Sequence, residues 1–206
     1  MSSVQRCAAR AVQGVLDRYR PNVVCFDTET TGLRGAVIQA AAIEMASDGT
    51  IVDDVAGIVP PPDGVSLEPG AVRVHGISQA TIDAEGQPAL PFLHGFLDFL
   101  ERAHAAGKPV VAHNSAFDVA RLDETLRWHG SKRRCAVPVV CTMRASKRHC
   151  GLVTARGAPK HPSNAELYHH LTGRVASEDV AALHDARADA TITARSYVEG
   201  RRRGWW

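Results

Sequence analysis

Two acidic side chains, Asp27 and Glu29, stand at the end of an apolar segment that predicts a buried strand. Successive side chains of a strand point to opposite faces of a sheet, so these two acids share one face. Like charges on one buried face are costly unless a cation neutralises them, and carboxylate oxygens are the ligands that hard divalent metals prefer. The pattern favours a metal site, with a surface pair of acids as the alternative.

Three side chains further along the chain favour the metal site. Asp118 falls in the first turn of a predicted helix, where the helix dipole alone would also explain it. Asp189 lies inside another predicted helix among small and apolar neighbours, where an acid that faces a sheet is costly. His184 stands just before that helix, within reach of Asp189, and a local cap is its alternative role.

The elements that position these residues follow from apolar periodicity and turn signals. The sequence predicts strands at residues 22–27, 37–45, 51–59, 109–113 and 137–141, and helices at residues 90–106, 116–129, 142–150, 163–171 and 186–199. Asp48 and Gly49 mark a hairpin turn, so the first three strands are expected to be antiparallel. Strands in a meander, followed by strands that alternate with helices, predict an α/β fold with a mixed five-stranded sheet flanked by helices.

The 206 residues are enough for one domain with one core. We expect a helical extension at residues 1–20, the main domain at residues 21–200, and a mobile, basic and aromatic tail at residues 201–206. The five cysteines are odd in number and include no C-x-x-C pair, which argues against a disulfide framework and favours a cytoplasmic location. No apolar run approaches the ~20 residues of a membrane span, so we expect no membrane partner.

The net charge is only +2, and its distribution is more informative than its sum. Between residues 121 and 174 the acids are few, namely Asp123, Glu124 and Glu166. The bases of this stretch include Arg127, Lys132, Arg133, Arg134, Arg144, Lys147, Arg148, Arg156 and Lys160. We predict a basic face that follows nucleic-acid phosphates, with an ordinary solvated surface as the alternative.

Taken in order, four motifs resemble the DEDDh, or DnaQ-like, family of 3′ to 5′ exonucleases, which includes proofreading epsilon subunits and RNase T-like enzymes. The motifs are FDTETTGL at residues 26–33, VHGI at residues 74–77, AHNSAFD at residues 112–118, and the segment from His184 to Ala190. The resemblance spans residues 22–198. It implies an RNase H-like fold and an enzyme that hydrolyses phosphodiester bonds.

The resemblance also implies the roles of the acids. Asp27, Glu29, Asp118 and Asp189 would bind two divalent ions, Mg²⁺ or Mn²⁺, which stabilise the attacking and leaving oxygens of an in-line phosphoryl transfer. His184 would act as the general base, a role for which an imidazole is well suited near neutral pH.

For the substrate, the resemblance implies that Thr30, Thr31, Gly32 and Leu33 hold the 3′-terminal nucleotide. Leu33 would be a wedge between the last two bases, or else part of the core. His75 and Asn114 would line the same pocket, or else cap local turns. The segment at residues 151–162 departs from the family pattern, and we expect it to shape the substrate channel.

The leading hypothesis is a metal-dependent exonuclease that removes nucleotides from the 3′ end of single-stranded DNA. The first alternative is the same chemistry on RNA, as in 3′-end trimming enzymes, because the sequence does not reveal how a pocket senses the 2′-hydroxyl. The second is a proofreading or interaction subunit of a polymerase. Residues 87–92 (QPALPF) faintly resemble a sliding-clamp peptide, but Leu90 and Phe92 are needed by the helix that follows.

Overall fold

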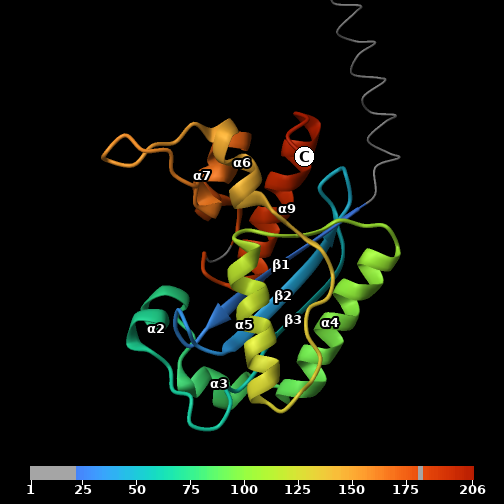
Figure 1. Ribbon diagram of the computed structural model, residues 1–206, viewed down its shortest axis with the longest axis vertical. Coiled ribbons are helices and arrows are strands. Elements are labelled where there is room, and N and C mark those ends of the chain that lie inside the picture. Colours follow the sequence, from blue (N-terminus) through green and yellow to red (C-terminus); the bar gives the residue numbers. More distant parts are fainter. Residues whose placement is uncertain (1–21, 181–182) are drawn as a thin grey trace, which may run out of the picture.

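The computed structural model describes residues 22–180 and 183–206, so the predicted extension at residues 1–20 lies outside the described residues. Its centre is a five-stranded sheet with the strand order β3-β2-β1-β4-β5. The strands are β1 (Val23–Thr30), β2 (Val37–Met45), β3 (Ile51–Ile58), β4 (Val110–Ala112) and β5 (Val139–Cys141). The first three are antiparallel (Figure 1). Strands β4 and β5 run parallel to β1. The predicted mixed sheet is confirmed.

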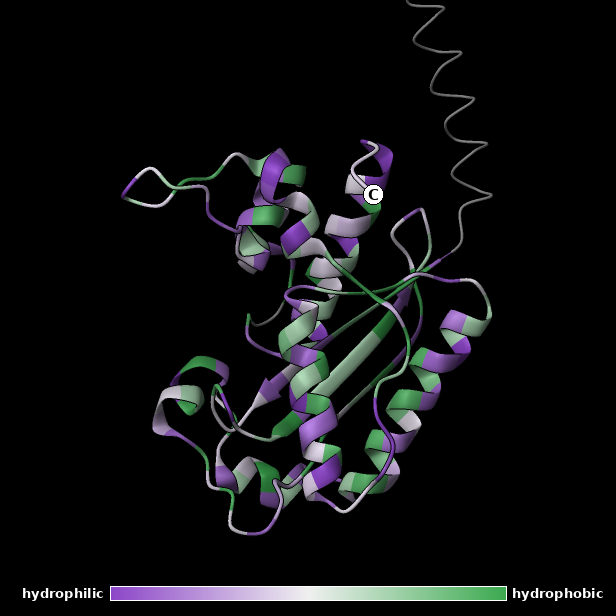
Figure 2. Cartoon of the chain, viewed as in Figure 1, coloured by the Kyte–Doolittle hydropathy of each residue, from purple (hydrophilic) through white to green (hydrophobic). Residues whose placement is uncertain are grey.

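Helices cover both faces of this sheet. They are α2 (Pro69–His75), α3 (Gln79–Glu85), α4 (Ala89–Ala105), α5 (Ser115–Trp128), α6 (Thr142–Cys150), α7 (Asn164–Thr172), α8 (Ala176–Asp179) and α9 (Ala186–Arg202). Helices α4 and α5 pack on one face, against Val24 and Phe26 of β1. Helix α9 packs on the other face, against Val23 and Cys25. Strand β1 is buried on both faces and begins with apolar residues, whereas its last four residues, from Asp27 to Thr30, are polar (Figure 2).

Three short helices, α2, α3 and α8, were absent from the sequence prediction. Each spans one or two turns, too short for a repeating apolar face. Their ends do carry local signals: Pro69 begins α2, and Ser78 forms a capping box with Thr81 at the start of α3. Strand β1 also runs further than predicted, to Thr30, so both of its acids lie within the strand.

The end of the chain packs on the domain, which corrects the predicted mobile tail at residues 201–206. Helix α9 continues to Arg202, beyond its predicted end. The Trp206 ring stacks on Tyr197 with ring centroids 5.4 Å apart, and its Nε1 donates to the Tyr197 carbonyl at 2.9 Å. Trp205 stacks on His149 of α6 with centroids 4.4 Å apart. Aromatic packing therefore fastens α6 to the end of α9.

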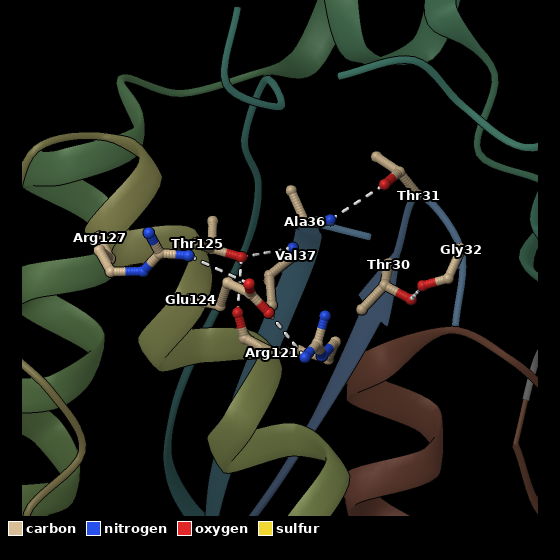
Figure 3. A network of polar contacts seen from close by, with 9 residues as sticks. All are labelled: Thr30, Thr31, Gly32, Ala36, Val37, Arg121, Glu124, Thr125 and Arg127. Carbon is tan, nitrogen blue, oxygen red and sulfur yellow. Dashed lines mark hydrogen bonds and ion pairs between the residues drawn. The ribbon is translucent and has the colours of Figure 1, made fainter. Parts of the chain in front are cut away.

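The loop that follows β1 is held by hydroxyl groups (Figure 3). Thr31 Oγ1 accepts from the Ala36 N–H at 3.0 Å. Thr125 of α5 accepts from the Val37 N–H at 2.8 Å and donates to the Arg121 carbonyl at 2.7 Å. These bonds join the loop, β2 and α5 into one unit.

Two further findings concern the described residues as a whole. None of their helices has both the length and the apolar character required to cross a membrane. All four cysteines among them, Cys25, Cys135, Cys141 and Cys150, are free thiols.

Candidate active site

Asp27 and Glu29 lie on the α9 face of the sheet, because they continue the alternation of Val23 and Cys25 along β1. Both acids are half-buried. Thr28 between them points to the opposite face, where its hydroxyl donates to Asp118 Oδ1 at 2.9 Å. Asp118 comes from the first turn of α5 and is only 3% exposed. The end of β1 thus brings three acids from two elements together.

The fourth acid, Asp189, is placed by the first turn of α9. The Asp185 side chain caps this helix by accepting from the Ala188 N–H at 3.0 Å. Gln39 of β2 fixes the helix start, because its amide donates to Asp185 at 2.7 Å and accepts from the Ala186 N–H at 3.0 Å. The sequence prediction missed Gln39, since a lone glutamine in a strand carries no signal of a partner 146 residues away.

His184 precedes α9 in a left-handed backbone conformation, with φ of 62°. Its N–H donates to Asp189 Oδ2 at 2.9 Å, and its Nδ1 lies 4.0 Å from the same oxygen. The side chain is 57% exposed. The imidazole therefore lies beside Asp189 and is open to solvent.

The acids and His184 line one cleft of about 440 Å³, together with Thr28, His113, Phe117, Ser163, Asn164, Ala165 and Leu183. Ligand atoms of Glu29, His184 and Asp189 lie within 4.8 Å of one another, and in the described part of the chain they form the one such group. Several carboxylates in a small volume are the donor set of a hard divalent cation such as Mg²⁺ or Mn²⁺. The residues present therefore fit the metal that the sequence predicted.

The acids raise one another's pKa, as an uncompensated cluster of negative charge must. Burial, followed by the charges of Asp118, Asp189 and Glu29, raises the pKa of Asp27 well above its ordinary value. Burial and the neighbouring acids raise the pKa of Glu29 to about 8. Burial raises the pKa of Asp118 to about 7, although the Thr28 hydrogen bond opposes this. Burial also raises the pKa of Asp189, and His184 partly offsets that shift.

A second cavity of about 400 Å³ adjoins the cleft, with Thr28, Glu29 and Phe117 shared by both. We call it the groove. It is also lined by Thr30, Gly32, Leu33, Glu68, Gly70, Ala71, Val74 and His75. Leu33 and Val74 are 82% and 54% exposed, which is unusual for apolar side chains and suits contact with a flat apolar ligand. A Cβ at Gly32 would lie 2.1 Å from the Glu68 carboxyl group, so the Glu68 side chain lies directly against this glycine.

A family model described as exonuclease, that of the RNase T family, matches residues 24–197. The chain belongs to this exonuclease family. It is 28% identical to Exodeoxyribonuclease 10 of Escherichia coli strain K12 over 126 residues, which are 60% of this chain and 46% of that protein. It is 30% identical to Ribonuclease T of Shewanella frigidimarina over 138 residues, 62% of each chain. The chain thus spans about half to two thirds of these curated relatives.

Solved structures agree on the fold. The nuclease domain of 3′hExo, a DEDDh family member bound to rAMP, superposes with a TM-score of 0.67 at 13% identity. The match covers 90% of this chain and 94% of that one. The predicted DEDDh resemblance and RNase H-like fold are confirmed.

The exonuclease-family fold brings most, but not all, of the predicted substrate residues to the groove. Thr30, Gly32, Leu33 and His75 line it. His75 also serves the local turn, because its Nδ1 accepts from the Ile77 N–H at 3.0 Å. The hydroxyl of Thr31 is used within its own loop, and Asn114, with φ of 65°, precedes α5.

Asn114 and Thr31 line neither cavity. The structure instead adds Glu68, Val74 and Phe117 to the groove. Of these, Val74 and Phe117 lie within the quoted motifs, which was the available signal; nothing in the sequence marked Glu68.

The raised pKa values predict how pH and metal affect stability. Without metal, the folded state keeps protons on Glu29 and Asp118 that the unfolded chain has released. The free energy of unfolding should therefore fall as the pH rises from about 5 to about 8. A divalent metal should reverse this loss at high pH, raising the melting temperature by about 5–10 °C when present at about 100 times its dissociation constant.

Differential scanning fluorimetry at several pH values, with EDTA or Mn²⁺, measures these effects. In EDTA the variant Asp27→Asn should be more stable than the wild type, by a margin that grows as the pH rises above about 4, and it should lose the metal-induced increase. A metal-free stability that rises with pH, or an undiminished metal effect in the variant, contradicts the assignment.

Proposed function

We propose that this chain is a metal-dependent 3′ to 5′ exonuclease that hydrolyses the terminal phosphodiester bond of single-stranded DNA. The observation that carries the proposal is the junction of the two cavities at Glu29. An acid-lined cleft suited to cations meets a groove whose volume suits one nucleotide. A terminal nucleotide in the groove would hold its phosphate over the acids, which is the arrangement that exonucleolytic cleavage needs.

The four carboxylates have distinct tasks in this proposal. Asp27 would be a ligand of both divalent ions, and Glu29, Asp189 and Asp118 would complete their coordination. When bound, the ions would supply positive charge to both oxygens of the in-line displacement. Thr28 orients Asp118 through its hydroxyl, and the His184 N–H donates to Asp189 Oδ2 at 2.9 Å, so these two carboxylates have a fixed direction.

His184 would take the proton of the attacking water on a ring nitrogen. Its exposed imidazole stands beside Asp189, and its backbone bond to that acid sets its position. Since the proton acceptor must return its proton to solvent after each cycle, the 57% exposure of this side chain suits the role.

In the groove, Leu33 would be an apolar wedge against the last base, and Val74 would add apolar surface to the same groove. The similar proteins are named for both DNA and RNA substrates, Exodeoxyribonuclease 10 and Ribonuclease T. An exoribonuclease that trims RNA 3′ ends is therefore the second candidate, and the same groove would serve it. A polymerase or clamp contact finds no support, because Leu90 and Phe92 pack against the core. A cytoplasmic location, inferred from the cysteines, stays a prediction.

The test is digestion of matched 5′-labelled oligonucleotides, DNA and RNA, single- and double-stranded, with Mn²⁺ or EDTA. We expect a ladder that shortens from the 3′ end, on single-stranded DNA most rapidly, and none in EDTA. Asp27→Ala should abolish the ladder, because the shared ligand of both ions is lost, while thermal unfolding shows that it still folds. Undiminished digestion by this variant rules out the proposed site, and faster digestion of RNA selects the second candidate.

The role of His184 is tested separately. The variant His184→Ala should lower kcat by about 10²–10⁴-fold, as for the loss of a general base, while it keeps the stabilisation by Mn²⁺. His104→Ala, an exposed histidine on α4, is the matched control and should leave kcat unchanged. An unchanged kcat in His184→Ala removes this residue as the base.

A further inference from the structure

His113 follows β4 and joins two places that are far apart in the sequence. Its Nδ1 lies 3.0 Å from Thr142 Oγ1, at the start of α6. Its Nε2 lies 3.1 Å from the Pro162 carbonyl oxygen, just before α7. The imidazole therefore closes the base of residues 142–162, a unit we call the basic segment.

The hydrogen bonds assign one form of this imidazole. A carbonyl oxygen can only accept, so Nε2 carries the proton and donates to Pro162. Nδ1 then accepts from the Thr142 hydroxyl at 3.0 Å, a shorter contact than the 3.4 Å from that hydroxyl to the Ala112 carbonyl oxygen. Burial lowers the pKa of His113 to about 4, although the Pro162 hydrogen bond opposes this, and the ring is neutral near pH 7. Because both nitrogens are occupied by the protein, His113 has none left for a substrate.

The basic segment is suited to a polynucleotide. Helix α6 buries Thr142, Ser146 and Cys150, and Arg144 and Arg148 lie on its opposite, exposed side. Residues 152–160 fold back on themselves through a bridge between Val153 and Pro159, and project from the domain as the orange loop in Figure 1.

Charge in this segment is almost entirely positive. The sequence contains no acid between Glu124 and Glu166. Within the part of the chain that the structure describes, Lys160 pairs with Glu166 at 2.7 Å, whereas Arg144, Lys147, Arg148 and Arg156 form no ion pair. These unneutralised bases remain available to phosphates beyond the terminal nucleotide.

The base of the segment is also next to the acids. His113 lines the same cleft as Asp27 and Asp118. Two residues after Pro162, Asn164 donates to the Asp189 carbonyl at 3.1 Å and accepts from the Thr193 hydroxyl at 3.2 Å. The contacts of His113 and Asn164 thus fix the segment relative to the position of bond cleavage.

We propose that His113 is a positioning residue for polynucleotide substrates: it holds the basic segment at a fixed place beside the acids, so that upstream phosphates and the terminal nucleotide are bound together. This inference rests on the proposed function. It predicts that loss of His113 affects two classes of substrate differently. A small ester fills only the cleft and the groove, while an oligonucleotide also needs the basic segment.

The experiment compares the p-nitrophenyl ester of thymidine 5′-monophosphate with a single-stranded DNA oligonucleotide, using the full chain and Mn²⁺. For His113→Ala, kcat/KM should fall by about 10- to 100-fold on the oligonucleotide and stay within about twofold on the ester. Its salt dependence on the oligonucleotide should also be shallower, because fewer phosphates are held. The matched control is His94→Ala, which removes a partly buried histidine of α4 whose Nε2 lies 2.9 Å from Ser131 Oγ. It should leave kcat/KM unchanged on both substrates.

Milder variants keep the inference testable where His113→Ala does not fold. His113→Gln retains a donor for Pro162, and Thr142→Val removes only the hydroxyl; both should show the same separation of substrates to a smaller degree. Equal losses on both substrates, or no loss on the oligonucleotide, overturn the inference. A wild type that cleaves the ester and the oligonucleotide supports the proposed function whatever the variants do. A wild type that cleaves neither overturns both.

Discussion

Mutual repulsion among buried acids is the constraint on which this structure depends. Strand alternation places Asp27 and Glu29 on the face that α9 covers, and α9 adds Asp189 from its first turn. In water such acids would be ionised, but here burial and mutual charge favour their protonated forms. A bound cation would offset both the cost of burying the charged carboxylates and the repulsion between them. The clustered acids therefore lower the stability of the metal-free fold, and the same acids suit a cation-binding site.

Polar bonds around the acids keep the cluster from relaxing. Gln39 ties the start of α9 to β2, Thr28 holds Asp118, and Asn164 links α7 to the Asp189 carbonyl. Each bond joins elements that are distant in the sequence. The core on both faces of β1 supplies the stability that the acids reduce. Function is thus concentrated where the central strand changes from apolar to polar (Figure 2).

Much of this could be predicted from the sequence, because its strongest patterns are local. The bounds of β2 and α6 match the prediction, and the order of the acids along the chain was enough to indicate the family. What was missed depends on tertiary contacts. Gln39, Glu68 and His113 have no local pattern that reveals their partners. The last residues appeared mobile for the same reason, since the ring that receives Trp206 is known only from the fold.

The central claim is that the acids form one centre for two divalent ions, shared through Asp27. The most direct measurement is anomalous diffraction from crystals that contain Mn²⁺ and a nucleoside 5′-monophosphate. We expect two manganese peaks in the cleft, both bound by Asp27, with the nucleotide base against Leu33. A cleft without manganese, or a single ion that Asp27 does not bind, would contradict it.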